Sequence, residues 1–159
     1  MPPLFLRRAT KDDSTFLFTL RNEETVRHFS LTTDPIDHAV HEKWFAKRLA
    51  SADSVIFIAE VAGAPIAQVR FDRAGREAEV SIAVVAAFRG KGYGTGIISE
   101  ATKKCFDVFP DVGRVVAHIN MDNAASEKSF TKAGYLSEGE TEQNGVKRKQ
   151  LVFRKQARR

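Results

Sequence analysis

Hydrophobic residues recur along this chain at spacings that change several times. Residues 5–9 begin with two apolar residues and form a candidate first strand. The apolar residues that follow, up to Leu20, are one, three or four apart, as on one face of a helix. Asp12 or Asp13 can cap the start of that helix. A short helical turn is expected next, over 23–29.

The middle of the chain passes from helix to strand. A second helix is expected from Asp37, its cap, to about Ala50, because apolar residues pair four apart there. Strand-like runs then cover 55–61, 66–72 and 79–84, separated by short connections that contain glycine. Three antiparallel strands in series are therefore predicted.

The C-terminal half alternates between helix and strand. Its expected elements are a helix after Gly94 that ends at Pro110, a strand over 115–120, a helix from Asn123 to Gly134, and two strands over 135–138 and 149–153. The whole order is β, α, α, β, β, β, α, β, α, β, β. This order favours one α+β domain over 1–159 with a mixed sheet, rather than a doubly wound parallel one.

Composition narrows the class of protein. At 159 residues the chain has the size of one domain, and it has no apolar run long enough to span a bilayer. Its N-terminus does not resemble a signal peptide, so a cytoplasmic location without membrane association is expected. Cys105 is the only cysteine, which excludes an intrachain disulfide. No metal site is expected.

The net charge of +5 has a local origin. Residues 147–159 hold seven Lys or Arg and no acidic residue, leaving 18 of the 25 basic residues against 20 acidic ones in the rest. The basic tail at about 154–159 is interpreted as a solvated terminus. A nucleic-acid partner is not expected, because the tail lacks interleaved aromatic residues.

The most informative stretch is residues 88–95, which lie between a predicted strand and a predicted helix. Its three glycines let the backbone approach a ligand closely, and the helix behind them directs unpaired N–H groups at that ligand. A phosphate group suits such a site. A Walker A loop is excluded because no Gly-Lys-Ser/Thr occurs, and a dinucleotide fingerprint because Ile97 stands where its third glycine belongs.

This loop resembles the pyrophosphate motif of the GNAT acetyltransferases, Arg/Gln-x-x-Gly-x-Gly/Ala, at Arg89, Gly92 and Gly94. Residues 78–84 resemble the family's fourth strand, and residues 123–135 resemble its Asn-x-x-Ala/Ser segment. The resemblance implies a single-domain, mixed and mostly antiparallel sheet of about seven strands. Helices would cover both faces, and a cleft would open between the fourth and fifth strands.

The resemblance also implies acetyl-CoA as cofactor and a small-molecule amine as substrate, bound by a monomer or homodimer. The pantetheine arm would bind along the fourth strand, and the pyrophosphate would accept hydrogen bonds from the backbone of the glycine loop. The implied cofactor-binding residues are Ile82, Ala83, Val84, Arg89, Gly90, Lys91, Gly92, Tyr93, Gly94, Thr95, Asn123, Ser126 and Phe130.

Acetyl transfer to an amine requires that the ammonium lose a proton. On the strand that ends at residue 84, Glu79 and Ser81 share the face opposite the apolar residues, so Glu79 is the leading base and Ser81 lies beside it. Glu79 could equally be a solvated carboxylate at a strand end. His118 on the next strand is the second candidate, with a pKa near neutrality.

One residue departs from the family pattern. The position that often holds a tyrosine proton donor for the departing thiolate is Phe130 here. Tyr93, Tyr135, Ser126 or a water could take its place, or the thiolate could leave unprotonated.

The early residues carry the substrate prediction. They resemble the GNAT subgroup that acetylates a nucleotide-linked amino sugar in pseudaminic or legionaminic acid pathways, at positions Arg21, Asn22, His41, Trp44, Gln68 and Arg70. Arg21 or Arg70 could bind a diphosphate, while Asn22, Gln68 and His41 could bond hydroxyl groups. Trp44 suits a core anchor better than a substrate contact, and His41 could instead satisfy a backbone carbonyl.

Other functions stay open. The acceptor could be a protein or peptide N-terminus, as in ribosomal-protein acetyltransferases, or a small polyamine or aminoglycoside. Phe130 would also suit a non-catalytic acyl-CoA sensor.

Overall fold

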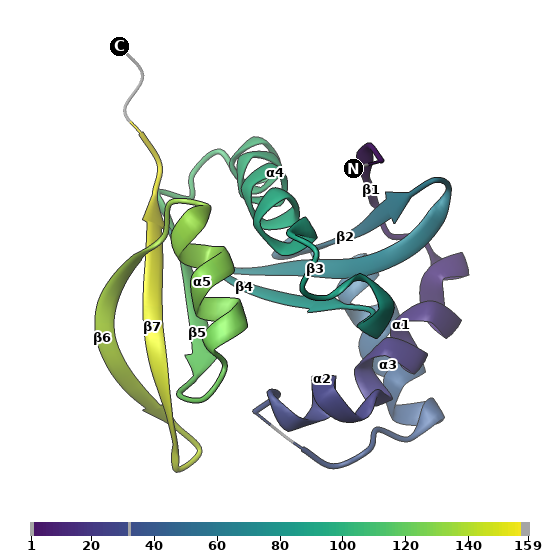
Figure 1. The fold of residues 1–159 in the computed structure, drawn as a ribbon. Helices are drawn as coiled ribbons and strands as arrows, with labels where there is room; N and C mark the ends of the chain where they lie inside the picture. The colour runs from purple at the N-terminus through teal and green to yellow at the C-terminus, as the bar shows by residue number, and fades with distance from the viewer. Residues whose placement is uncertain (1, 32, 157–159) are drawn as a thin grey trace.

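A seven-stranded mixed sheet organises the chain. The computed structural model describes residues 2–31 and 33–156 (Figure 1). The sheet has the order β1-β2-β3-β4-β5-β7-β6. Its strands are β1 (Leu4–Arg8), β2 (Ser54–Val61), β3 (Ala64–Ala74), β4 (Glu77–Val84), β5 (Arg114–Asn120), β6 (Leu136–Gln143) and β7 (Val146–Arg154). All neighbours are antiparallel except β4 and β5, which are parallel.

Helices cover both faces of this sheet. They are α1 (Ser14–Asn22), α2 (Glu24–His28), α3 (His38–Ala50), α4 (Tyr93–Val108) and α5 (Ala124–Lys132), with short 3₁₀ turns η1 (Lys11–Asp13) and η2 (Ala86–Phe88). In Figure 1, α4 lies above β2–β4 and α5 in front of β5, whereas α1 and α3 lie at the lower right, on the other side of the sheet. None of the helices within the described ranges is long and apolar enough to cross a membrane. The predicted fold, including helices on both faces, is confirmed.

Each face has its own core. Under α4 and α5 the core includes Ile97, Ala101 and Phe130 together with the apolar face of β4 and β5. Under α1 and α3 a smaller core joins Leu17 and Phe45 to residues of β2. Burial of these apolar side chains, at about 25 cal/mol per Å², holds the helices on the sheet.

The pairing of β4 with β5 stops early. It runs only from Glu77–Val80 against Arg114–Ala117. Beyond that point β5 pairs with β7 up to Asn120, whereas β4, among the described residues, has no further neighbour on this side from Ser81 to Val84. The two strands therefore diverge, and the unpaired edge of β4 keeps backbone donors and acceptors that a ligand can use.

The start of α1 differs from the prediction. Thr10 caps the preceding 3₁₀ turn, and its backbone N–H donates to Asp13 at 2.8 Å. The Asp13 carboxylate also accepts two hydrogen bonds from the Arg7 guanidinium, at 2.8 and 2.9 Å, and is buried. Asp13 occupies the N-cap position of α1, but its side chain does not cap the helix, because its carboxylate bonds Arg7 and Thr10 instead. Asp12 lies within the preceding 3₁₀ turn.

The last two strands are longer than predicted. β6 and β7 reach Gln143 and Val146, and the turn between them places Asn144 and Gly145 at positive φ. β6 is an edge strand with mostly exposed residues, so it has little apolar alternation. Arg154, assigned to the basic tail, ends β7 and pairs with Glu138. Residues 157–159 of that tail lie outside the described part.

Candidate active site

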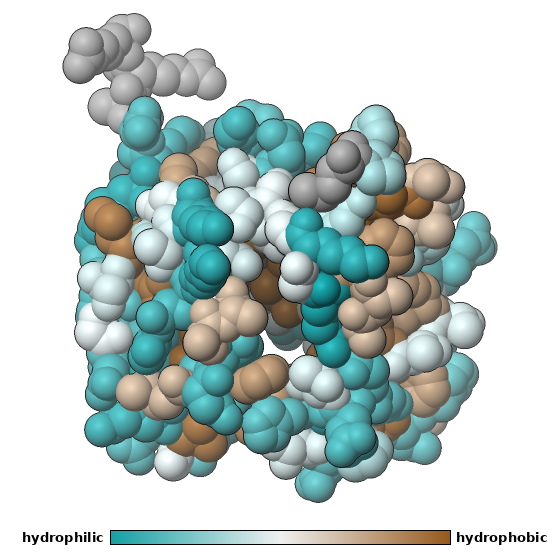
Figure 2. Space-filling view, viewed as in Figure 1, coloured by the Kyte–Doolittle hydropathy of each residue, from teal (hydrophilic) through white to brown (hydrophobic). Residues whose placement is uncertain are grey.

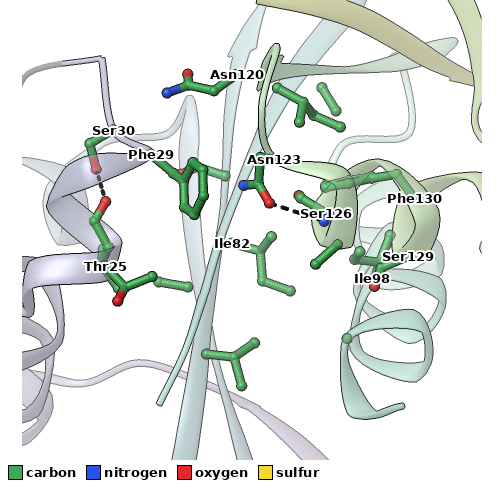
Figure 3. Close-up of a pocket in the computed structure, with 18 of the residues that line it drawn as sticks. Thr25, Phe29, Ser30, Ile82, Ile98, Asn120, Asn123, Ser126, Ser129 and Phe130 are labelled. Atoms are coloured by element: carbon green, nitrogen blue, oxygen red, sulfur yellow. Dashed lines mark hydrogen bonds between the residues drawn. The ribbon is translucent and has the colours of Figure 1, made fainter. Parts of the chain in front are cut away.

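A cleft of about 990 Å³ opens where β4 and β5 diverge. It is lined by the end of β4, the glycine loop, β5 and α5 on one side, and by the α1–α2 region on the other. Figure 2 shows the cleft as a hollow near the middle of the view, with hydrophobic residues at its base. In Figure 3, Phe29 at the end of α2 faces Asn123 and Ser126 across it.

The glycine loop closes one end of the cleft. Gly90 and Gly92 have φ of 72° and 85°, in the left-handed region that side chains disfavour. Gly92 is the N-cap of α4 and provides no side chain to bond the first N–H groups of that helix. These donors and the helix dipole favour an anion at this point. A Cβ on Gly94 would lie 3.1 Å from Oγ of Ser129, so glycine also permits close packing of α4 on α5.

The two basic residues of the glycine loop, Arg89 and Lys91, lie in different surroundings. Arg89 lines the cleft, donates from Nε to the Val84 carbonyl at 2.9 Å, and forms an ion pair with Glu23. This pair joins the glycine loop to the N-terminus of α2. Lys91 is exposed, and its ammonium lies 5.7 Å from the ring centre of Phe88. Within the described chain, Ile82, Ala83, Val84, Gly90, Gly92, Gly94 and Thr95 also line the cleft, whereas Lys91 and Tyr93 do not.

Helix α5 contributes Asn123, Ser126 and Phe130 to the lining. The side chain of Asn123 caps this helix, as predicted, because its Oδ1 accepts a hydrogen bond from the backbone N–H of Ser126 at 3.2 Å (Figure 3). Its amide nitrogen stays available to a ligand. Phe130 is almost wholly buried and packs edge to face on Tyr135, with ring centres 4.9 Å apart.

The side chains that could donate a proton to the departing thiolate differ in their access to the cleft. Tyr93 is buried against Phe88. The Tyr135 hydroxyl bonds Thr102 at 2.7 Å in the core, and burial raises its pKa. Of the three side chains considered, Ser126 is the one that lines the cleft.

Glu79 and His118 form a pair between β4 and β5. Nδ1 of His118 lies 3.3 Å from Oε2 of Glu79, an ion-pair distance, although the angle is not that of a hydrogen bond. Nε2 of His118 donates to Oε1 of Gln150 on β7 at 3.2 Å. His118 lines the cleft, and Glu79 lies beside it with its side chain half exposed. Ser81 also lines the cleft.

This pairing shifts both protonation equilibria. Contact with His118 lowers the pKa of Glu79, and the charges of Arg70 and Arg148 act in the same direction. Contact with Glu79 raises the pKa of His118, against the effect of burial. The pairing therefore favours the ionised carboxylate and extends the pH range over which the imidazole is protonated.

The predicted substrate residues fall into two groups. Arg21, Gln68 and Arg70 line the cleft. Asn22 does not: its amide group bonds both the N–H and the carbonyl of Ile36 and so fixes the loop before α3.

His41 and Trp44 also lie away from the cleft lining. His41 is fully buried and stacks on Phe45, with ring centres 5.8 Å apart. His41 is therefore out of reach of a substrate hydroxyl group, because its side chain is enclosed in the core. The indole of Trp44 lies beneath three guanidinium groups, those of Arg21, Arg48 and Arg70.

Sequence reasoning missed the cleft residues Arg148 and Phe29, and also Gln150, which bonds His118. Arg148 and Gln150 alternate on β7, and the sheet register sets them opposite Asn120 and His118. Their polar side chains face the same side as His118, which could have been deduced had the last hairpin been predicted at full length. No local sequence pattern predicts that Phe29 lines the cleft, because the position of the α2 region over the cleft depends on tertiary packing.

Comparison with known proteins agrees with this geometry. A family model described as an acetyltransferase (GNAT) domain matches residues 3–136. No curated protein matches the sequence.

Solved structures share the fold. An aminoglycoside acetyltransferase, AAC(6')-Ib in complex with coenzyme A, superposes with a TM-score of 0.82 at 18% identity, covering 96% of this chain and 95% of that one. The spermidine N-acetyltransferase of Vibrio cholerae in complex with CoA and spermine gives 0.84 at 20% identity and 95% of both chains. An uncharacterised Bacillus halodurans protein gives 0.81 at 16% identity, covering 95% and 83%.

Proposed function

Because the chain belongs to the acetyltransferase (GNAT) domain family, we propose that it transfers the acetyl group of acetyl-CoA to a primary amine on a nucleotide-linked sugar. The observation that carries this proposal is that one cleft connects the glycine loop, the free edge of β4, the Glu79–His118 pair and a group of arginines. A site for a phosphorylated cofactor and a site for an amine thus meet in one space.

The residues present fit acetyl-CoA. N–H groups at the start of α4, left uncapped by Gly92, suit a pyrophosphate. The unpaired edge of β4 beyond Val80 offers amides and carbonyls to a pantetheine arm, and the free amide nitrogen of Asn123 faces the same space. When bound, acetyl-CoA supplies an acetyl group activated as a thioester.

The Glu79–His118 pair would receive the acceptor amine. The ionised Glu79 carboxylate attracts an ammonium and lowers the cost of bringing it into the cleft. His118 takes up the ammonium proton once it is neutral itself, directly or through water. Gln150 accepts from Nε2 and so keeps Nδ1 of His118 directed towards Glu79.

The charges of the cleft favour an anionic acceptor. Arg21, Arg27, Arg70 and Arg148 line its acceptor side. Among the described lining residues Asp34 is the one carboxylate, while Glu79 lies beside the cleft and Asp72 pairs with Arg70. A diphosphate matches the paired N–H groups of arginine, whereas a polyamine or an aminoglycoside would meet like charge. Structures of AAC(6')-Ib with ribostamycin and of the spermidine N-acetyltransferase with spermine are known, so the acceptor proposed here differs in charge from those two ligands.

A second candidate is a non-catalytic acyl-CoA sensor. The replacement of a tyrosine by the buried Phe130 favours it, because a phenyl ring cannot protonate a thiolate. The Glu79–His118 pair favours an enzyme, since a sensor needs no group that accepts a proton.

The test is a turnover assay with acetyl-CoA and a panel of amines. UDP-linked amino sugars, peptides with free N-termini, spermidine and an aminoglycoside are each incubated with the purified protein. Free thiol is measured, and the acetylated product is identified by mass. Acceptor-dependent thiol release with the UDP-linked amino sugar supports the proposal. Binding of acetyl-CoA without turnover on any amine would support the sensor instead.

A further inference from the structure

We infer that His41 is a positioning residue which orients the Arg21 guanidinium into the cleft as the receptor for an acceptor anion. This inference rests on the proposed function, because the anion belongs to the amine substrate. It differs from the role expected from the sequence, in which His41 itself touched the substrate.

The partners of His41 define its hydrogen positions. Nε2 lies 3.2 Å from the backbone carbonyl of Ser14, which only accepts, so Nε2 carries the hydrogen. Nδ1 lies 3.4 Å from Nη1 of Arg21, which only donates, so Nδ1 presents a lone pair. The Nδ1 contact requires a neutral imidazole, and the Nε2 contact fixes which neutral tautomer is present. Burial and the nearby Arg21 charge lower the pKa of His41, which keeps it neutral.

Arg21 is a half-buried cation that has no partner anion in the described chain. Its guanidinium carbon lies 4.1 Å from the ring centre of Trp44, and in the described chain it forms no ion pair. Burial, with the charges of Arg70 and Arg48, lowers its pKa to about 10. The Asp72 carboxylate is engaged by those other two arginines.

An arginine held in this way is prepared for a ligand. The Trp44 ring restrains one face of the guanidinium, and Nδ1 of His41 accepts from one of its N–H groups. The remaining N–H groups are free for an anion in the cleft, which Arg21 lines. Since the side chain is already ordered, the anion does not bear the entropic cost of fixing it.

The choice of histidine follows from charge. A carboxylate at position 41 would orient Arg21 equally well but would neutralise it and compete with the ligand. A neutral imidazole orients the guanidinium and leaves its charge intact. His41 therefore acts through Arg21 without touching the substrate.

A double-mutant cycle tests this role. UDP is titrated by calorimetry into protein saturated with CoA, so that the glycine loop is already occupied. His41→Phe keeps the ring stacked on Phe45 but removes the acceptor, and about a fivefold to tenfold weaker UDP affinity is expected. Arg21→Ala should weaken UDP more. In the Arg21→Ala background, His41→Phe should cause no further loss.

Two isosteres keep the test valid if His41→Phe does not fold. In His41→Asn the amide oxygen replaces Nδ1, so UDP affinity should stay within about twofold of wild type. In His41→Gln the amide lies near Nε2 instead, so the loss of UDP affinity should match that expected for His41→Phe. His38→Phe, on the exposed side of the same helix, is the matched control and should leave UDP affinity unchanged.

Two results would overturn the inference. One is an equal loss of UDP affinity from His41→Phe with and without Arg21, which would indicate a general packing role for His41. The other is no UDP binding to the CoA complex at millimolar UDP. Either would leave the acetyl transfer itself untouched. Conversely, UDP binding with the expected coupling, but no thiol release on any amine, would refute the enzyme and keep the anion site.

Discussion

The Glu79–His118 contact sets where protons lie in the resting site. Because each partner stabilises the charged form of the other, the carboxylate is a weaker base and the imidazole a stronger one than the free side chains. Glu79 therefore contributes mainly by its negative charge, and His118 can take a proton only after it has lost its own.

The first prediction concerns Glu79→Gln. Turnover should fall by about 10²-fold or more, since the ammonium loses its counter-charge and His118 its partner. The affinity for CoA should not change, because Glu79 lies away from the glycine loop. Steady-state kinetics and calorimetry with CoA measure the two effects. Turnover equal to wild type would remove Glu79 from the mechanism.

The second prediction is a pH shift in the same variant. In wild type, His118 has a raised pKa, so it becomes neutral, and activity rises, above its ordinary value of about 6.5. Without the Glu79 carboxylate this pKa falls, since Arg148 still disfavours the charged imidazole. The acidic limb of kcat/KM for Glu79→Gln should therefore move to lower pH. A limb that stays in place would show that another group controls it.

Side chains were predictable where one element decides their direction. Alternation on β4 placed Glu79 and Ser81 on one face, and the same rule on β5 selected His118. Asn22 and His41 lie away from the cleft lining, because their surroundings depend on how α1 packs on α3, which no local pattern encodes. The same burial that removes His41 from the substrate gives it a neutral tautomer beside Arg21.

At the level of elements, α4 and the loop before it carry the cofactor site. The helix starts at Tyr93 because Gly92 adopts a left-handed conformation that turns the chain out of η2 and into the helix. This glycine leaves the first N–H groups of α4 without a side-chain cap. The loop is thus shaped by backbone rather than by side chains.

The third prediction compares two glycines. Gly92→Ala should destabilise the protein by about 1–2 kcal/mol, since alanine disfavours φ of 85°. It should also weaken CoA binding at least about tenfold, because a loss of about 1.4 kcal/mol in binding free energy corresponds to that factor. Denaturant unfolding and CoA calorimetry measure the two effects.

Gly75→Ala is the matched control. Gly75 has φ of 64° in the β3–β4 turn, and a Cβ there meets nothing within 4 Å. A similar loss of stability is expected, with CoA affinity unchanged. Equal CoA affinities of the two variants would contradict the assignment of the loop.

Helices and strands with a periodic pattern of apolar residues were predictable from sequence. The β6–β7 hairpin at the edge of the sheet was predictable only in part. The helix at 93–108 and the strands of the central sheet bury one face, which leaves a period in the sequence. Strand β6 buries almost nothing, and Gly139 adds a positive φ where its register with β7 shifts. Its extent is set by pairing with β7.

At the scale of the whole molecule, the cleft separates two groups of elements that touch across it. The Arg89–Glu23 ion pair joins the glycine loop to α2. On the far side, Arg148 donates to the carbonyl of Phe29 at 3.3 Å. The α2 region is thereby held over the cleft from both ends. The glycine loop and the early helices were predictable from sequence, but the contacts that join them across the cleft were not, because they form only in the folded chain.

The fourth prediction concerns Glu23→Gln. The amide keeps the oxygen that caps α2 but removes a negative charge beside the expected pyrophosphate. CoA should bind about twofold to fivefold more tightly at low salt, with a smaller difference at high salt. Glu24→Gln, the exposed neighbour, is the control and should have little effect. Weaker CoA binding by Glu23→Gln would mean that the ion pair orders the loop.

The central claim is that backbone amides at the start of α4 bind the diphosphate of CoA beside the open edge of β4. Calorimetric titration of the purified protein with CoA tests it most directly. One molecule of CoA should bind per chain with measurable heat. An absence of heat up to millimolar CoA, with the protein folded, would contradict the account.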